Sequence, residues 1–503
     1  MHKNVVKTYI DKLHELGILI DAKIPQDVLD LNVDCLSYDN RNLHGTSIFI
    51  CKGANFKDEY AKEAFKKGAV AYISEKKIDG LEDCILVNDV RKAIQHLAIL
   101  HFGNPAASLT NIGITGTKGK SSITYILQGI INRYLESEGK NDCAIISSID
   151  TYDGIEKFES HLTTPEPIEL LQHFYNAKES GISHLIMEVS SQALKYDRVF
   201  GINYEVGCFT NFGEDHISSI EHPTVEDYFI SKLKIFDQSK FACIYSGSDR
   251  FDEILAYAKD KCDLVTYGFN KTDDVYCSDV KPQGSHIDFH VKTKDFETDM
   301  TIGMPGIFNV ENALAAIAIS LCLNIPEKFI SEGLAQASVP GRMKVVTSAD
   351  KKISIIVDYA HNEMSFEALY QSLKKEYPKH KIVGIFGCPG LKAKDRREDL
   401  PRVASKYADS LIIVEEDSGP EPFESISNDI VKNIEIENFE VIEDRDVAIK
   451  HAIFDLSDRD TVIALTGKGE ETRLKRGDNY EDCESDLSIA EKYISEYDKS
   501  VGK

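Results

Sequence analysis

The sequence lacks a long apolar run and is poor in basic residues. Its longest apolar stretch, Ala313 to Ile325, is interrupted by polar residues and is shorter than the roughly 20 residues that a membrane span needs. The N-terminus has no apolar core followed by a small-residue cleavage site. Lys and Arg number 58 against 83 Asp and Glu, a formal net charge of −25. Because non-specific nucleic-acid binding needs basic surface, we expect no nucleic-acid partner. Because no apolar run is long enough, we expect no membrane insertion.

The cysteines form neither a metal-binding pattern nor a disulfide framework. There are 11 of them, scattered along the chain, with no CxxC pair and no alternation with histidine. An odd number without metal spacing is typical of reduced, mostly buried thiols. We therefore expect a cytoplasmic protein.

The length and the order of the segments predict several α/β domains. A chain of 503 residues is too long for one ordinary core, and 42% apolar with 28% charged residues is typical of a globular protein. Short apolar runs alternate with helical patterns, which favours mostly parallel sheets covered by helices. Residues 102–111 have a linker-like composition, and a second break falls near residues 338–343. We predict three α/β domains, residues 1–106, 107–338 and 339–503.

Several individual elements can be placed. Residues 46–53 and 69–75 read as strands, and residues 58–68 as a helix that ends at Gly68. Further strands are expected at residues 183–191, 204–212, 241–247, 353–361, 381–388, 409–417 and 461–467. The last four precede helical segments, which predicts a doubly wound C-terminal domain.

A glycine-rich loop is the strongest local signal. It consists of Gly116, Thr117, Lys118, Gly119, Lys120 and Ser121, followed by Ser122, and lies between a predicted strand and a long helix. Such a loop turns its backbone N–H groups toward phosphate at the positive end of the helix dipole. Lys120 can then reach the outer phosphates of a phosphate chain, and the Ser121 hydroxyl can bind Mg²⁺. The spacing is not that of the usual P-loop, since Ile114 stands where its first glycine falls, and a turn without a ligand is the alternative.

Three other residues gain meaning only together. Glu188 ends an apolar strand, His216 follows another, and Lys232 lies on a helical stretch rich in aromatic residues. A carboxylate and an imidazole at the ends of parallel strands are well placed beside a nucleotide. Taken singly, each has an ordinary explanation: a solvated glutamate, a structural histidine and a surface lysine. In the last third, Arg342, Asp358 and Gly467 fall at strand ends or turns, where ordinary turns and caps are the alternative.

Nine motifs carry a resemblance to a known family. They are TGTKGKS, HLTTPE, MEVSSQAL, FTNFGEDH, YFISK, FNVENALAA, VPGRM, VDYAHN and GKGEE, in this order from about Ser37 to the C-terminus. In these motifs the chain resembles the Mur ligases. The resemblance implies an ATP-dependent ligase that joins an amino acid to a UDP-N-acetylmuramoyl-dipeptide through an acyl phosphate. It also implies that the three predicted domains bind the UDP-sugar, ATP and the incoming amino acid respectively.

The resemblance assigns roles residue by residue. Ser37 and Asn40 match residues that grip the uridine nucleotide, although the family usually has serine at the second position. Thr163, Thr164, Ser190 and Arg198 match residues that bind the muramoyl-dipeptide. Glu188 and His216 match Mg²⁺ ligands, and Lys232 matches a lysine carbamylated by CO₂. Asn309, Asn312, Arg342 and Asp358 match residues around the ATP.

The chemistry that the resemblance implies has defined needs. A carboxylate is a poor electrophile, so ATP phosphorylates it while Lys120 and Mg²⁺ neutralise charge on the transferred phosphate. The amine then attacks and phosphate leaves. The amine must first lose a proton, so a general base is needed, and His216 is one candidate. The C-terminal domain must bring the amino acid and exclude water, so domain closure is expected.

The incoming amino acid is predicted from charge. Arg397, Gly467 and Glu471 match residues that hold its backbone ends. The matching selectivity loop, Glu416 to Glu421, has no arginine and contains three acids, Glu416, Asp417 and Glu421. Such a loop repels a second carboxylate and favours a cationic side chain, so we predict L-lysine. Ornithine or another diamino acid stays open, as does selection by a different loop around solvated acids.

Other functions remain as alternatives. A polyglutamate- or cyanophycin-type ligase shares the phosphate loop, but the N-terminal domain and the motifs HLTTPE and MEVSS argue against it. An inactive Mur-like scaffold is expected to lack that domain or some of Lys120, Glu188, His216 and Lys232, all of which this chain keeps. A nucleotide-hydrolysing switch protein fits neither the loop spacing nor the GKGEE motif. We expect a monomer whose partners are small-molecule substrates.

Overall fold

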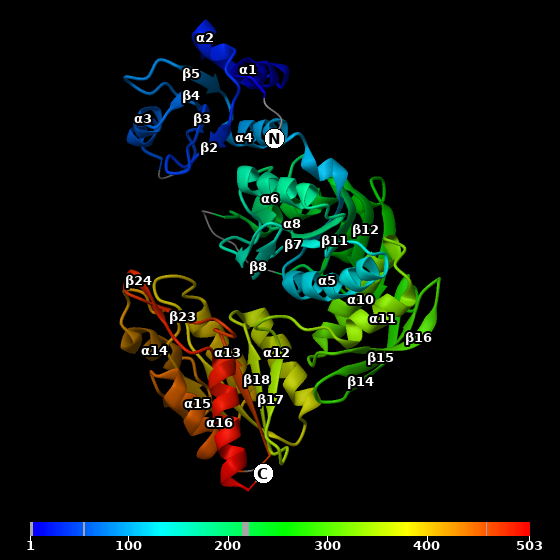
Figure 1. Ribbon diagram of the computed structural model, residues 1–503. Helices are drawn as coiled ribbons and strands as arrows, with labels where there is room; N and C mark the ends of the chain where they lie inside the picture. The colour runs from blue at the N-terminus through cyan, green and yellow to red at the C-terminus, as the bar shows by residue number, and fades with distance from the viewer. Residues whose placement is uncertain (1–3, 54–55, 214–220, 459, 503) are drawn as a thin grey trace. The chain divides into compact units, whose positions relative to one another are not determined.

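The computed structural model describes residues 4–53, 56–213, 221–458 and 460–502. The chain divides into two compact units, one of Met1–Tyr267 with Ile317–Phe329 and one of Gly268–Ala316 with Ile330–Lys503. Both units combine helices with mostly parallel sheets, which confirms the predicted fold class (Figure 1). The three-domain boundaries remain a prediction. No helix of the described residues is long and apolar enough to cross a membrane.

The first unit begins with a sheet in the order β1-β5-β4-β3-β2, parallel except for β1. Its strands are β1 (Leu19–Lys23), β2 (Cys35–Ser37), β3 (Ser47–Ile50), β4 (Ala69–Ser74) and β5 (Cys84–Val87). Its helices are α1 (Val6–Glu15), α2 (Gln26–Leu29), α3 (Asp58–Lys66) and α4 (Val90–Phe102). Helices α1 and α4 pack on one face and α3 on the other. The expected strands and helix are confirmed, with Gly68 (φ 103°) just beyond the end of α3.

The linker predicted at residues 102–111 differs from the structure. Helix α4 continues to Phe102, the 3-10 helix η1 (Pro105–Ser108) follows, and β6 already begins at Thr110. Pro105 is buried, and the Asn111 side chain donates to the carbonyl groups of Ala106 and Asn203. The polar, Pro-containing composition therefore belongs to a packed connection.

A second sheet of the first unit runs in the order β13-β12-β11-β6-β10-β7-β8-β9. Its strands are β6 (Thr110–Thr115), β7 (Ala144–Ile146), β8 (Asp150–Tyr152), β9 (Lys157–Glu159), β10 (His184–Glu188), β11 (Tyr204–Phe209), β12 (Ser239–Tyr245) and β13 (Asp263–Gly268). The helices are α5 (Lys120–Ser137), α6 (Pro167–Glu179), α7 (Ser191–Lys195), α8 (Val225–Leu233), η2 (Lys234–Gln238) and α9 (Phe251–Ala258). All pairs are parallel except those of β8 with β7 and β9.

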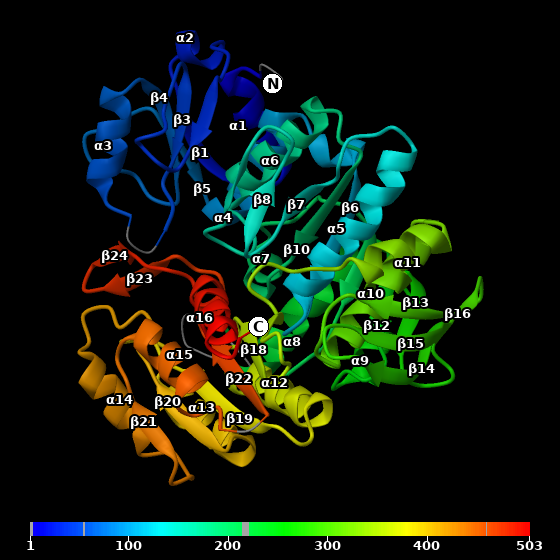
Figure 2. The same cartoon turned by 60° about the horizontal axis from the view of Figure 1, so that its bottom comes forward.

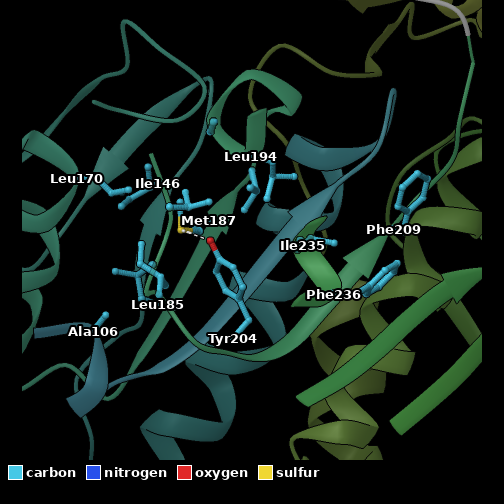
Figure 3. Packing of buried hydrophobic residues seen from close by; sticks show 14 of the residues in the cluster. Ala106, Ile146, Leu170, Leu185, Met187, Leu194, Tyr204, Phe209, Ile235 and Phe236 are labelled. Atoms are coloured by element: carbon cyan, nitrogen blue, oxygen red, sulfur yellow. Dashed lines mark hydrogen bonds between the residues drawn. The ribbon is translucent and has the colours of Figure 1, made fainter. Parts of the chain in front are cut away.

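One large apolar core supports this sheet. Strand residues such as Leu185 and Met187 pack with Leu170 of α6 and Leu194 of α7, and all four are at most 2% exposed (Figure 3). The hydroxyl of the buried Tyr204 donates to the sulfur of Met187 at 3.6 Å. This packing fixes the carboxyl ends of β6, β10 and β11, where the phosphate loop and Glu188 lie.

The second unit opens with an antiparallel meander that the sequence analysis did not predict. It consists of β14 (Val275–Pro282), β15 (Ile287–Lys292) and β16 (Glu297–Ile302). Helices α10 (Phe308–Cys322) and α11 (Glu327–Ala335) follow and cross the division between the units. The meander alternates exposed and buried residues, whereas the parallel strands are continuous apolar runs that are easier to recognise.

The predicted doubly wound C-terminal sheet is present, in the order β17-β18-β22-β19-β20-β21 (Figure 2). Its strands are β17 (Lys344–Thr347), β18 (Ile353–Asp358), β19 (Lys381–Phe386), β20 (Ser410–Ile413), β21 (Phe439–Val441) and β22 (Thr461–Thr466), with a separate hairpin of β23 (Arg473–Arg476) and β24 (Asn479–Asp482). The helices are α12 (Glu363–Glu376), α13 (Arg396–Tyr407), α14 (Phe423–Val431), α15 (Arg445–Phe454) and α16 (Asp486–Ser500). Only β17 runs antiparallel to its neighbour in this sheet.

Candidate functional site

The glycine-rich loop joins β6 to the N-terminus of α5, as predicted. Gly116 (φ 139°) and Gly119 (φ 86°) both have backbone conformations that favour glycine. A Cβ atom added to Gly116 would lie 1.9 Å from the Thr210 hydroxyl oxygen, so no other residue fits there. Ser121 and Ser122 lie in the first turn of α5. The loop thus presents the positive end of a long helix to an anion.

The residues after β11 hold this loop in place. The Lys118 backbone N–H donates to the Asn211 side chain at 2.8 Å, and the Thr210 hydroxyl donates to the Lys118 carbonyl at 2.6 Å. The Lys120 ammonium donates to the carbonyls of Gly116 and Thr117 at 3.0 and 3.1 Å. The sequence analysis assigned no role to Thr210 or Asn211, although both lie in the FTNFGEDH motif.

A set of hard oxygen atoms lies beside the loop. Glu188 ends β10 and is 1% exposed, which excludes the solvated glutamate considered above. Its Oε1 accepts from the Ser148 N–H at 2.9 Å and the Ser148 hydroxyl at 3.2 Å, and that hydroxyl lies 3.0 Å from the Ser121 hydroxyl. Carboxylate and hydroxyl oxygens are donors that fit Mg²⁺. Ser148 was missed by the sequence analysis, and His216 lies outside the described residues.

Lys232 is not a surface residue. It belongs to α8, is 1% exposed, and its ammonium donates to the Gly116 carbonyl at 2.8 Å. The same nitrogen lies 4.5 Å from the centre of the Tyr228 ring. The fold therefore brings a buried lysine directly onto the phosphate loop.

A cavity of about 190 Å³ lies next to these groups. Its lining residues are Lys120, Leu162, Thr163, Thr164, Ser190, Ser191, Gln192, Arg198, Glu221, Tyr228 and Lys232. It contains all four residues predicted to bind the muramoyl-dipeptide together with Lys120 and Lys232. Polar side chains outnumber the single aliphatic one, as expected for a site that holds a peptide and its reacting carboxylate.

Arg198 is tied to the N-terminal sheet through Glu166. Its guanidinium lies 2.9 Å from one carboxylate oxygen of Glu166, and the Lys52 ammonium pairs with the other. Arg198 also donates to the Thr164 carbonyl at 3.4 Å. Burial lowers the pKa of Lys52, while its pairing with Glu166 opposes that shift. Glu166 thus links Lys52, which lies just beyond the end of β3, to the predicted dipeptide arginine. No role was predicted for Glu166 from the sequence.

The two predicted nucleotide-gripping residues lie elsewhere in the first unit. Ser37, at the end of β2, hydrogen-bonds with the backbone of Asp39 at 3.0 Å. Asn40 is half-buried and its amide donates to Glu63 of α3 at 2.9 Å. Neither residue lines the cavity.

The residues predicted around ATP in the second unit form two local groups. Asn312 donates to the side-chain oxygen of Asn309 at 2.9 Å on α10, and both are buried. Asp358 accepts from the backbone N–H groups of Met343 and Ala360, and Arg342 lies 3.9 Å from it. Burial raises the pKa of Asp358, while Arg342 opposes that shift.

Arg397 already has acidic partners. Both of its terminal nitrogens donate to Glu421, at 2.8 and 2.7 Å, and one also donates to Asp429 at 3.1 Å. The forked pairing with Arg397 lowers the pKa of Glu421 to about 2. Glu421 is therefore neutralised within the protein, which the charge argument for the selectivity loop did not include.

The other predicted amino-acid-binding residues meet around Lys468. Its ammonium lies 2.6 Å from Glu471 and 3.1 Å from Asp417. Glu416 is 8% exposed, and a Cβ atom on Gly467 would lie 2.3 Å from its carboxylate. Burial raises the pKa of Glu416 to about 7, against the opposing effects of Arg445, Arg396 and Lys468.

Comparisons with known proteins agree with this arrangement. Residues 114–320 match the Mur ligase middle domain, and residues 341–469 match the Mur ligase glutamate ligase domain. The chain is 34% identical to a UDP-N-acetylmuramoyl-L-alanyl-D-glutamate–L-lysine ligase of Streptococcus agalactiae serotype Ia, over 92% of this chain and 93% of that one. A protein of the same name from Streptococcus pyogenes serotype M4 is 35% identical with the same coverage.

Solved structures share the fold. The structure of a UDP-N-acetylmuramoyl-L-alanyl-D-glutamate–2,6-diaminopimelate ligase covers 99% of the chain and of its own length, with a TM-score of 0.69 at 22% identity. A MurF structure from Acinetobacter baumannii covers 98% of this chain and 99% of its own, with a TM-score of 0.66 at 18% identity. The chain therefore belongs to the Mur ligase family and is an ATP-dependent ligase of that family.

Proposed function

We propose that this chain joins L-lysine to the D-glutamate carboxyl of UDP-N-acetylmuramoyl-L-alanyl-D-glutamate, with ATP as the energy source. One observation carries the proposal. A single cavity brings Lys120 and Lys232 of the phosphate site together with Thr164, Ser190 and Arg198, the predicted dipeptide site. A carboxylate held there lies beside the place where a terminal phosphate would sit. The names of the relatives from the two streptococci support L-lysine.

The acyl phosphate would form at the phosphate loop. Backbone N–H groups at the start of α5 bind the phosphates, and the Lys120 ammonium neutralises charge on the one transferred. Arg198 and Thr164 hold the dipeptide so that its carboxylate oxygen faces that phosphate. This positioning converts a reaction between two molecules into one within a complex.

We propose that Ser121 and Glu188 hold Mg²⁺, together with His216 and a carbamate on Lys232. The ion would supply charge neutralisation at the phosphate oxygens. Within the described residues, Ser148 links the two side chains: its N–H and hydroxyl donate to the Glu188 carboxylate, and its hydroxyl lies 3.0 Å from the Ser121 hydroxyl. Apart from the His216 imidazole, the ligand atoms are hard oxygens, so the residues fit this ion.

The burial of Lys232 beside the proposed metal site supports its carbamylation. A buried ammonium beside the metal site would repel the cation, whereas a carbamate supplies an anionic oxygen. The carbamate nitrogen keeps one N–H, so the hydrogen bond to the Gly116 carbonyl can persist. Activity should fall in buffer depleted of CO₂ and return with bicarbonate. The variant Lys232→Met should be inactive with or without bicarbonate, and Lys234→Met, in the adjoining η2, is the matched control. Activity of the wild type that is independent of CO₂ would contradict the carbamate.

Selection of the amino acid is assigned to the second unit. Within the selectivity loop, Glu421 pairs with Arg397 and Asp417 pairs with Lys468, which leaves Glu416 as the group that a cationic side chain would neutralise. Gly467 lies beside Glu416, and Glu471 pairs with Lys468. Both residues would hold the backbone ends of the amino acid. Arg397 can meet the amino acid's carboxylate only in competition with Glu421.

The remaining assignments complete the proposal. Residues 1–106 would bind the UDP-sugar with Ser37 and Asn40, residues 107–338 ATP, and residues 339–503 the amino acid. Asn309, Asn312, Arg342 and Asp358 would contact ATP.

The test is phosphate release by the purified protein with Mg²⁺-ATP and UDP-N-acetylmuramoyl-L-alanyl-D-glutamate. L-Lysine, L-ornithine, meso-diaminopimelate and L-alanine are compared, and the product is identified by mass. We expect release that depends on L-lysine, together with the ligated product. Product with another amino acid would retain the ligase and overturn the lysine assignment. ATP binding without any product would identify an inactive scaffold.

A further inference from the structure

A chain of three hydrogen-bonded side chains ends at the cavity. The Ser191 hydroxyl lies 2.9 Å from Nε2 of His222, and Nδ1 of His222 lies 2.6 Å from a carboxylate oxygen of Asp227. Ser191 begins α7, Asp227 lies in the first turn of α8, and these two helices pack against each other. Ser191 lines the cavity, whereas the His222 side chain is fully buried behind it. The proposed function gives none of these residues a role.

The charges determine the direction of the hydrogen bonds. Burial raises the pKa of Asp227, but hydrogen bonds from Lys195 and His222 bring this pKa below its usual value. Asp227 is therefore a carboxylate at neutral pH. A carboxylate only accepts, so Nδ1 of His222 must carry its hydrogen. Nε2 is then bare and accepts the hydrogen of the Ser191 hydroxyl. The Ser191 oxygen keeps its lone pairs for a donor in the cavity.

The surroundings keep His222 neutral at rest. Burial lowers its pKa, the hydrogen bond and charge of Asp227 oppose this, and the positive charge of Lys195 adds to the lowering. The Lys195 ammonium lies 2.7 Å from Asp227, and the Tyr228 ring packs edge-on against the imidazole with centres 5.1 Å apart. A neutral imidazole can accept a proton, and the carboxylate behind it stabilises the imidazolium that results.

The proposed reaction needs such an acceptor in this cavity. The amine that attacks the acyl phosphate becomes positively charged as its C–N bond forms, and it must lose a proton before phosphate leaves. We propose that Ser191, His222 and Asp227 form a proton relay that removes this proton from the attacking amine. This inference rests on the proposed function, because it places the acyl carbon in the cavity that Ser191 lines.

The relay is balanced at each bond. An N–H bond of the amine breaks and its proton passes to the Ser191 oxygen, while the Ser191 proton passes to Nε2 of His222. The electron pair stays on the nitrogen, and the phosphate departs with the electrons of its bond to the acyl carbon. Asp227 acts as a positioning residue, and its side chain is 32% exposed, so the proton can be returned to solvent beside it.

The test compares two nucleophiles with one acyl phosphate. The nitrogen of L-lysine is strongly basic and holds its proton tightly once it has bonded to the acyl carbon. Hydroxylamine is a free base at neutral pH, and after attack its weakly basic nitrogen can lose the proton to water without a protein base. In His222→Asn, we expect amide formation with L-lysine to fall about 100- to 1,000-fold. Its residual rate should increase with pH more steeply than in the wild type. Hydroxamate formation should stay within about threefold of the wild type, because activation of the carboxylate is unaffected.

Two further variants separate chemistry from folding. His173 is also buried and its Nδ1 lies 2.7 Å from Asp153, but it does not line the cavity, so His173→Asn removes a similar pair without touching the relay. We expect it to keep both reactions in their wild-type ratio. Ser191→Ala removes one hydroxyl and should reproduce the selective loss even if His222→Asn does not fold.

Four results would contradict the relay or the proposed function. An equal loss of both products in Ser191→Ala and His222→Asn would overturn the relay, as would wild-type amide formation in both. The same selective loss in His173→Asn would also overturn it. If the wild type forms neither amide nor hydroxamate, the proposed function itself fails.

Discussion

The buried Glu416 carboxylate should reduce the stability of the free protein at neutral pH. When L-lysine binds, the same carboxylate should pair with the cationic side chain and stabilise the complex. Burial raises its pKa from 4.5 to about 7, and each unit of pKa corresponds to about 1.4 kcal/mol. Below pH 4.5 the carboxyl is protonated in both the folded and the unfolded chain, and this group favours neither. Between pH 4.5 and about 7 the unfolded chain has lost this proton while the folded chain still holds it, so the stability of the folded state falls across this range and levels off above it. The group then costs the folded state about 3 kcal/mol, an order-of-magnitude figure.

The variant Glu416→Gln removes this charge. We expect its free energy of unfolding to exceed that of the wild type by up to about 3 kcal/mol at pH 8, with the difference vanishing toward pH 4.5. Urea unfolding without ligands at both pH values measures this. The same variant should lose about 2 to 3 kcal/mol of transition-state stabilisation with L-lysine, a 30- to 150-fold fall in kcat/KM, since the cation loses a buried partner.

Glu424→Gln is the matched control, because Glu424 is exposed in the first turn of α14. It should change neither stability nor kcat/KM measurably. If Glu416→Gln is no more stable than the wild type at pH 8, the Glu416 carboxylate does not lower the free energy of unfolding, and the reasoning is wrong. If the variant is stabilised but uses L-lysine as well as the wild type does, Glu416 does not meet the lysine side chain.

Two further changes test the first unit. Gly116→Ala should lower ATP-dependent phosphate release at least 100-fold, because its Cβ would collide with Thr210; normal release would show that the loop conformation is wrong. Glu166→Gln should lower the free energy of unfolding by about 2 kcal/mol in urea, since Lys52 and Arg198 lose their shared partner. Glu166 is the N-cap of α6, and Glu179→Gln, an exposed change at the last residue of that helix, is its control. Equal stability of the two variants would contradict the role of Glu166.

Features that depend on a short stretch of chain could be predicted from the sequence. The phosphate loop is recognisable because glycine, lysine and serine stand between a strand and a helix, and each has a separate physical reason to be there. The apolar strands of the parallel sheets were found because they are buried on both faces and read as continuous runs. The meander at β14–β16 escaped because its alternating pattern resembles that of loops and short amphipathic segments.

The contacts between distant side chains could not be predicted from the sequence and are seen in the tertiary structure alone. Ser148 beside Glu188, Glu166 between Lys52 and Arg198, and Glu421 on Arg397 come from separate segments that packing brings within hydrogen-bonding distance. The packing of α8 likewise places the Lys232 ammonium on the Gly116 carbonyl of the phosphate loop. In the selectivity loop, burial raises the pKa of Glu416, whereas Asp417 and Glu421 form ion pairs. Charge and hydrogen bonding act through space at a few ångströms, and that distance is set by the fold rather than by position along the chain.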